Sequence, residues 1–484
     1  MATIVSASGK VLLAGGYLVL DPAHSGIVVS TSSRFYSIIR ESPSARPHQI
    51  TVRSPQFLEA TWSYDVLFSP RGEIGLRASV SNASKNKFVQ LAIERVLFLS
   101  LQISGIQAAR QATAQGLEIV IVGDNDFYSQ RGQLAAMKLP SAIASLAKIP
   151  KFAATNCSLP DVHKTGLGSS AALITSLVGA LLVHFSLIPA SSLQTENEAD
   201  EGRRLAHNVA QYVHCLAQGK VGSGFDVSSA TYGSQIYKRF DPDVLQPLMS
   251  DDIPARLTDI LSPSNKAWNH SVMPFKLPPL TRIMLADVDA GTDTPAAVGK
   301  VLAWRKQHAD KAAALWTALS AANDSLAKAL TWLSTLHQRS PGAYQTAVLR
   351  LVVLPHDKWS AIASGDEVTK GFLRVFEISE AIRAKMREMG NLSDVPIEPV
   401  EQTRLLDACI ARPGVIAGGV PGAGGYDAIW LLVLTPPNNS QAVSAVESIW
   451  STWREMNVSP LAASESHERG ARLENTAMLK GLKL

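Results

Sequence analysis

The fold of this chain is decided by the stretch Pro160-Asp161-Val162-His163-Lys164-Thr165-Gly166-Leu167-Gly168-Ser169-Ser170-Ala171-Ala172. It delivers two glycines and two hydroxyls directly into a long apolar segment, residues 171–188. Glycines let a backbone approach phosphate closely, and the free N–H groups and dipole of a helix start attract an anion. The stretch therefore predicts a phosphate cradle at the start of a buried helix.

Two other interpretations of this stretch stay open. Residues 166–171 also satisfy the GxGxxA form of the dinucleotide fingerprint, which would indicate an NAD(P)-dependent oxidoreductase. No strand is expected directly before Gly166, and no acidic residue ends a strand about twenty residues later, so the context does not favour that reading. A simple Gly/Ser helix cap, without a ligand, is the second alternative.

Length and composition place the chain among multidomain globular proteins. It has 484 residues, of which 46% are hydrophobic and 18% charged, and this length predicts two or more domains with a cleft between them. The net charge of +4, with no long basic run, does not indicate a nucleic-acid partner. The segment 171–188 approaches membrane-spanning length, but Thr175, Gly179 and His184 interrupt it, so no membrane partner is expected.

The cysteines and the N-terminus bear on the compartment. Cys157, Cys215 and Cys409 are scattered and lack CxxC spacing, which signals neither a disulfide framework nor a zinc site. The first ten residues lack a basic stretch leading into an apolar region, unlike a secretory signal. We therefore expect a cytoplasmic protein.

Strand and helix patterns alternate in both halves of the chain. We predict an N-terminal domain over 1–245, a proline-rich connector over 246–280 and a C-terminal domain over 281–484. The first domain is expected to hold strands in 3–40 and 118–122 and helices in 85–102, 171–188 and 195–218. The second is expected to hold strands 282–288 and 428–434, helices in 296–335, 341–352, 366–389, 401–411 and 441–456, and a glycine-rich loop over 414–425.

Two further stretches complete an ordered set with the phosphate cradle. They are Ser6-Ala7-Ser8-Gly9-Lys10-Val11-Leu12-Leu13-Ala14-Gly15-Gly16-Tyr17 and Gly418-Gly419-Val420-Pro421-Gly422-Ala423-Gly424-Gly425-Tyr426-Asp427. Together the three resemble the motifs of the GHMP kinase superfamily, and no Walker A motif competes with them. The resemblance implies an α+β, two-domain fold: an N-terminal mixed α/β half that binds ATP and a C-terminal ferredoxin-like α/β half with helical additions.

Within that superfamily, three runs are similar to the phosphomevalonate kinase branch, in its eukaryotic, fungal-like form. They are residues 14–21, 219–230 and 287–295. This implies transfer of the ATP γ-phosphoryl group to 5-phosphomevalonate, giving 5-diphosphomevalonate for isoprenoid and sterol synthesis. The alternatives are another GHMP enzyme, such as a mevalonate kinase or diphosphomevalonate decarboxylase, and a non-catalytic sensor on the same fold.

The resemblance also implies roles for individual residues, with ATP and Mg²⁺ as cofactors and a monomer or homodimer as the assembly. The catalytic pair is Lys10 and Asp226, although Asp226 could also be a simple helix cap. The ATP-binding residues are Lys164, Thr165, Gly166, Leu167, Gly168, Ser169, Ser170 and Ala171. The substrate-binding residues are Tyr17, Lys220, Gly222, Ser223, Gly422, Ala423 and Gly424.

The expected metal site departs from that of relatives that phosphorylate an alcohol. Those relatives hold Mg²⁺ with a motif serine and a helical glutamate, and the glutamate position falls near His214 here, with Gln218 one turn later. We therefore expect Mg²⁺ to be held mainly by ATP, Ser170 or Ser169, and waters, which suits an ion that keeps few protein ligands. His214 is expected to be a hydrogen-bonded structural residue.

Overall fold

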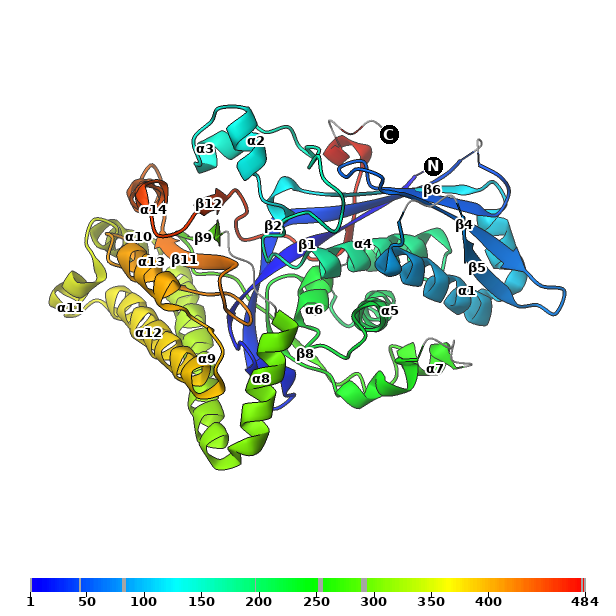
Figure 1. The fold of residues 1–484 in the computed structure, drawn as a ribbon. Helices are drawn as coiled ribbons and strands as arrows, with labels where there is room; N and C mark the ends of the chain where they lie inside the picture. The colour runs from blue at the N-terminus through cyan, green and yellow to red at the C-terminus, as the bar shows by residue number, and fades with distance from the viewer. Residues whose placement is uncertain are drawn as a thin grey trace.

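Two β-sheets organise the chain in this computed structural model, which describes residues 2–42, 45–80, 84–195, 197–250, 256–288, 294–479 and 482. Figure 1 shows helices grouped beneath the first sheet at the right and around the second sheet at the left. Short α2 (Arg131–Ala136) and α3 (Ile143–Leu146) follow β6 (Leu117–Gly123), and α7 (Leu257–Leu261) lies inside the expected proline-rich connector. The α+β class with two mixed halves is confirmed.

The first sheet is built on a long hairpin. β1 (Thr3–Ala14) pairs antiparallel with β2 (Ser25–Glu41), with Val5 opposite Ser37. The order continues as β13-β1-β2-β6-β3-β4-β5, and β7 and β8 attach through β2. The remaining bounds are β3 (Gln49–Arg53), β4 (Thr61–Phe68), β5 (Ile74–Ala78), β6 (Leu117–Gly123), β7 (Gln235–Lys238), β8 (Ser271–Pro274) and β13 (Arg472–Leu473).

Four helices cover one face of this sheet: α1 (Lys87–Thr113), α4 (Ser169–His184), α5 (Glu201–Gln218) and α6 (Phe225–Tyr232). α4 packs on β1 and β2, and most of its apolar residues are fully buried, as expected of a core helix. Among the described residues, α1 has the length and apolar composition of a membrane span. Half of its most apolar window is buried in the molecule, however, and a core helix passes the same test.

The second sheet has the order β10-β11-β9-β12, with every neighbouring pair antiparallel. Its strands are β9 (Thr281–Val288), β10 (Val415–Gly419), β11 (Ala428–Leu434) and β12 (Val458–Leu461). This is the ferredoxin-like strand order, with the helical additions inserted after its first strand. The helices are α8 (Thr294–Gln307), α9 (Ala309–Arg339), α10 (Pro341–Leu351), α11 (Trp359–Ile362), α12 (Glu367–Ser393), α13 (Val400–Ile410) and α14 (Gln441–Thr452).

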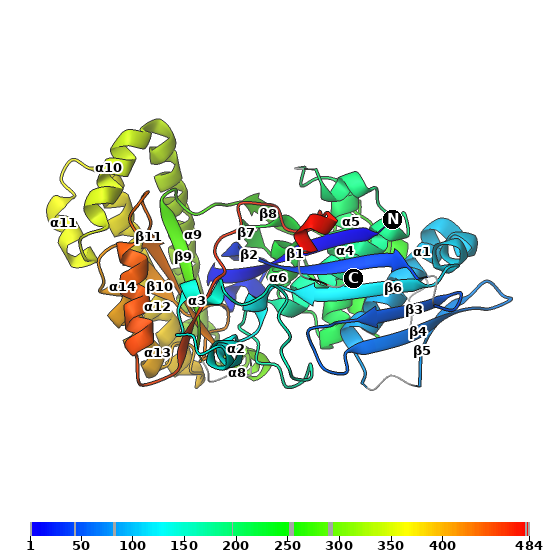
Figure 2. The ribbon, with the colours of Figure 1, turned by 90° about the horizontal axis from the view of Figure 1, so that it is seen from above.

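Three details differ from the sequence-based expectation. The glycine-rich stretch 414–425 is not all loop, because its first part forms β10, a fully buried strand. β8 lies inside the expected connector and pairs with β7 of the first sheet. The end of the chain returns to the first sheet, where β13 pairs with β1; Figure 2 shows this red segment beside β1 and away from the second sheet. Residues 289–293 of the run 287–295 lie outside the described residues.

Candidate active site

A cleft of about 660 Å³ lies where the start of α4, the loop before α6 and the loop before β11 face one another. α8 forms a further wall through Val298 and Leu302. Most of the residues predicted from the sequence line this cleft: Lys10, Tyr17, Lys164, Gly166, Gly168, Ser169, Ser170, Lys220, Gly222, Ser223, Asp226, Gly422, Ala423 and Gly424. Three sequence motifs that lie far apart in the chain thus meet at one cavity.

The phosphate loop and Lys10 form one packed unit. Gly166 and Gly168 both have φ of 77°, a left-handed conformation that glycine adopts without strain. The Lys10 amide donates to the Leu167 carbonyl oxygen at 2.9 Å, and Lys10 Nζ donates to the Gly166 carbonyl oxygen at 3.0 Å. A Cβ at Gly168 would lie 2.9 Å from Lys10 Cε. The second glycine therefore leaves room for the lysine side chain.

Three predicted ATP-binding residues have side chains that do not reach the cleft. Leu167 and Ala171 are buried in the hydrophobic core. Thr165 is also buried, and its hydroxyl donates to the carbonyl oxygen of Asp126. These side chains hold the loop from behind.

Lys10 and Asp226 face the same part of the cleft. Desolvation lowers the pKa of the Lys10 ammonium, and the Asp226 carboxylate opposes that effect. The ammonium also lies 5.3 Å from the centre of the Phe225 ring. Asp226 is the second residue of α6, whose N-cap is Gly224, and its Oδ1 accepts from the Val227 amide at 2.9 Å. The carboxylate is thus not the helix N-cap.

His214 occupies the place between the phosphate loop and Asp226. Its Nε2 lies 3.1 Å from Ser170 Oγ, 3.2 Å from Gln218 Nε2 and 3.9 Å from Asp226 Oδ2. Desolvation lowers the pKa of this imidazole, with Asp226 opposing, so His214 is neutral at pH 7. The position therefore carries no negative charge for a metal.

The side-chain oxygens near His214 fit Mg²⁺ as a small part of its ligand set, with phosphates and waters supplying the rest. Ser170 Oγ and Asp226 Oδ2 lie 3.1 and 3.9 Å from the same imidazole nitrogen, and both residues line the cleft. In the described part of the chain, no group of three or more His, Cys, Asp or Glu side chains could hold a metal ion. An ion that keeps most of its ligands from phosphates and waters suits these two donors.

On the other side of the cleft, Tyr17 joins the first and third motifs. Its hydroxyl donates to the Ala423 carbonyl oxygen at 2.7 Å, and its backbone has φ of 62°, which is rare for a residue with a side chain. A Cβ at Gly16 would lie only 2.4 Å from the Gly422 carbonyl oxygen. Close backbone contact and one side-chain bond therefore set the glycine-rich loop against the end of β1.

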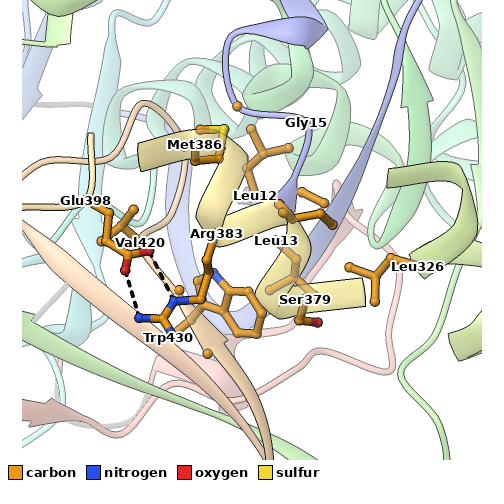
Figure 3. Close-up of a pocket in the computed structure, with 16 residues that line it drawn as sticks. Leu12, Leu13, Gly15, Leu326, Ser379, Arg383, Met386, Glu398, Val420 and Trp430 are labelled. Atoms are coloured by element: carbon orange, nitrogen blue, oxygen red, sulfur yellow. Dashed lines mark hydrogen bonds and ion pairs between the residues drawn. The ribbon is translucent and has the colours of Figure 1, made fainter. Parts of the chain in front are cut away.

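A small pocket of about 30 Å³ lies behind this contact (Figure 3). Leu12 and Gly422 line both this pocket and the cleft. On its far side Arg383 forms two bonds with Glu398, at 3.1 and 2.7 Å. Burial would lower the pKa of the guanidinium, but Glu398 raises it above its usual value. This buried ion pair anchors α12 beneath the glycine-rich loop.

The sequence patterns missed a buried carboxylate at the end of β9. Asp287 is 1% exposed, and its Oδ1 lies 3.0 Å from Nε2 of His163, just before the phosphate loop. Arg131 approaches the other carboxylate oxygen at 3.4 Å. The sequence-based signal was only Asp287 in the run 287–295, which gave no hint of its partners.

Comparison with known proteins decides the family. No protein-family model matches the chain. The "Phosphomevalonate kinase, peroxisomal" of Arabidopsis thaliana is 37% identical over 459 residues, covering 90% of each chain. A phosphomevalonate kinase of Aspergillus fumigatus is 35% identical over 488 residues, covering 93% of this chain and 90% of that one. The chain belongs to the phosphomevalonate kinase family. The predicted superfamily, branch and enzyme class, an ATP-dependent phosphotransferase, are therefore confirmed.

A solved structure of the same family supports the fold. The Streptococcus pneumoniae phosphomevalonate kinase, in complex with phosphomevalonate and AMPPNP, superposes with a TM-score of 0.57 at 16% identity, covering 97% of this chain and 99% of that chain. At this identity the match establishes the GHMP kinase fold alone.

Proposed function

We propose that this chain transfers the γ-phosphoryl group of ATP to 5-phosphomevalonate, forming 5-diphosphomevalonate and ADP. The observation that carries the proposal is the meeting of three backbone loops around Lys10: the phosphate loop, the loop 219–224 and the loop 421–424. Such a site can hold phosphate groups on two sides of one cation. Membership of the phosphomevalonate kinase family is the reason for proposing ATP and 5-phosphomevalonate as the substrates.

The acceptor of this reaction needs little help to become a nucleophile. A phosphomonoester has its second pKa at about 6, so its attacking oxygen is mostly ionised at pH 7. That oxygen forms a bond to the γ-phosphorus while the bond between the γ-phosphorus and the β,γ-bridging oxygen breaks, and ADP leaves with the electron pair. The main task is to neutralise crowded negative charge and to align the groups.

Lys10 is proposed to carry out that neutralisation. Its Nζ is held at the Gly166 carbonyl oxygen, at the edge of the phosphate loop, and it shares the cleft with Asp226. We assign Asp226 to orienting Lys10 and the metal, since Asp226 acts on Lys10 electrostatically. The nucleotide phosphates, with Ser170 and Asp226, would hold Mg²⁺, which supplies further neutralisation of phosphate charge when bound.

The proposed compartment is the cytoplasm, and the proposed assembly is a monomer or a homodimer. One relative is named as peroxisomal, so the compartment requires its own test. Localisation of a fluorescently tagged full chain would decide it.

A coupled assay of ADP release tests the proposed reaction. Mevalonate, 5-phosphomevalonate and 5-diphosphomevalonate are offered separately with ATP and Mg²⁺. We expect turnover with 5-phosphomevalonate alone. Turnover confined to either of the other acceptors would overturn the proposed specificity, and turnover with none would favour a non-catalytic role.

A further inference from the structure

The loop between α5 and α6 is held from behind through its carbonyl oxygens. The Arg239 guanidinium donates through Nη2 to the Val221 carbonyl oxygen at 3.0 Å and also to that of Gly222. Its Nη1 donates to the Leu20 carbonyl oxygen, at the end of the 3-10 turn that follows Tyr17. One planar cation thus joins two segments that both line the cleft.

The next two carbonyl oxygens of the loop are bound in the same way. The Tyr237 hydroxyl donates to the Ser223 carbonyl oxygen at 2.9 Å. Gln211 Nε2 donates to the Gly224 carbonyl oxygen at 2.7 Å. All four carbonyl oxygens from Val221 to Gly224 are therefore occupied by side chains of β7, its following residue and α5.

This arrangement determines what the loop presents to the cleft. In a trans peptide the N–H of the next residue points away from the carbonyl oxygen, so carbonyls held behind the loop direct N–H groups to its front. The N–H groups of Ser223, Gly224 and Phe225 meet no acceptor in the described part of the chain, and these residues line the cleft. A row of such N–H groups binds an anion.

The cation behind the loop favours the same ligand. Arg239 is 7% exposed, and burial lowers the pKa of its guanidinium, but a guanidinium stays charged in proteins. Its charge lies against the negative ends of the peptide dipoles and so strengthens the positive character of the N–H groups in front. Hydrogen bonds polarise one another in this way in a low dielectric.

We infer that Arg239 is a positioning residue for the phosphate group of the acceptor: it fixes the loop 219–224 against Leu20 so that the loop N–H groups face that phosphate. The inference rests on the proposed function, because it assigns this loop to the acceptor and the 166–170 loop to ATP. Arg239 lies behind the loop and touches no substrate.

Arg203 provides a matched control for the test. It is also a buried arginine, and its Nη1 donates to the carbonyl oxygens of Thr231 and Ala471 at 2.8 and 3.0 Å. Neither of these carbonyls belongs to a residue that lines the cleft. An arginine-to-lysine change keeps the charge at both positions but loses the planar set of donors.

The experiment compares steady-state kinetics and melting temperature for wild type, Arg239→Lys and Arg203→Lys. We expect both variants to melt lower than wild type. Only Arg239→Lys should raise the KM for 5-phosphomevalonate, by roughly tenfold or more, since small misplacements of a binding group are costly, while the KM for ATP stays within about twofold. Equal acceptor KM values in the two variants would overturn the inference.

Tyr237→Phe keeps the test decisive if Arg239→Lys does not fold. It removes one hydrogen bond to the same loop, so the KM for 5-phosphomevalonate should rise by a few-fold with the KM for ATP unchanged; an unchanged acceptor KM would refute the inference. The wild-type protein separates the two claims. Absence of turnover with 5-phosphomevalonate in wild type contradicts the proposed function, whereas normal wild-type turnover with unaltered variants contradicts only the role of Arg239.

Discussion

Replacing Lys10 by methionine removes a single positive charge from the centre of the cleft. Methionine keeps most of the length of the side chain, so the contact with Gly168 is retained and the loop keeps its shape. What is lost is the ammonium that Gly166 holds at 3.0 Å, in a position where desolvation already makes its charge costly.

The expected size of the effect is that of removing a charge-stabilising donor from an active site. Removing one preorganised charge-stabilising donor from an active site lowers kcat by about 10²–10³-fold, or about 2.7–4 kcal/mol. We expect Lys10→Met to fall in this range, with a change in the KM for ATP of less than about threefold, because the N–H groups of the phosphate loop remain.

The assay is the coupled ADP assay with saturating ATP and 5-phosphomevalonate. Lys311→Met is the control, because Lys311 is exposed on α9 and does not line the cleft. The control should retain wild-type kcat. The proposed role of Lys10 is contradicted if Lys10→Met loses no more activity than Lys311→Met while both proteins remain folded by circular dichroism.

Other expected outcomes concern the backbone loops and a partly buried histidine, His270. Tyr17→Phe removes the 2.7 Å bond to the facing glycine-rich loop, which should cost about 1 kcal/mol of stability by chemical denaturation and raise the acceptor KM a few-fold. Gly166 and Gly168 both have φ of 77°, so alanine is strained at either position. Only a Cβ at Gly168 would contact Lys10, so Gly168→Ala should lower kcat. A Cβ at Gly166 would enter open space, so Gly166→Ala should instead raise the KM for ATP. Burial lowers the pKa of His270 to about 4, so the folded protein keeps it neutral while the unfolded chain takes up a proton below about pH 6.5. The contribution of His270 to the free energy of unfolding is therefore complete above pH 6.5 and falls by up to roughly 3 kcal/mol as the pH drops towards 4. Over that range the melting temperature of His270→Gln should fall less steeply than that of wild type.

The sequence was sufficient wherever a local pattern determined the structure. The buried helix after Ser170 was predicted because a glycine-serine start and an unbroken apolar run leave few alternatives. The strand 428–434 has its predicted bounds, and Gly219 ends α5 in the left-handed conformation, as its position after the last apolar residue indicated. The motif glycines could be predicted as cleft residues because a phosphate loop needs backbone freedom. That need appears in the sequence as a glycine pattern.

The sequence was insufficient where a residue acts through a distant partner. Arg239 follows a short strand and looks like a surface residue, since nothing in its neighbourhood indicates that Leu20 and Val221 carbonyls need donors. The pairing of β13 with β1 joins opposite ends of the chain, which no local period can show. β10 escaped prediction because its two glycines resemble a loop, whereas one of them leaves space for Leu431 on the neighbouring strand.

In the proposed mechanism the site neutralises charge between two phosphates and does not depend on removing a proton from the acceptor. The direct test is the single-turnover rate of phosphoryl transfer to 5-phosphomevalonate, measured in H₂O and in D₂O at a pH one unit or more above the acceptor's second pKa of about 6. The same rate in both solvents is the predicted result, because no proton moves in the step. A clearly slower rate in D₂O that disappears in Asp226→Asn would contradict the claim and assign Asp226 the role of general base.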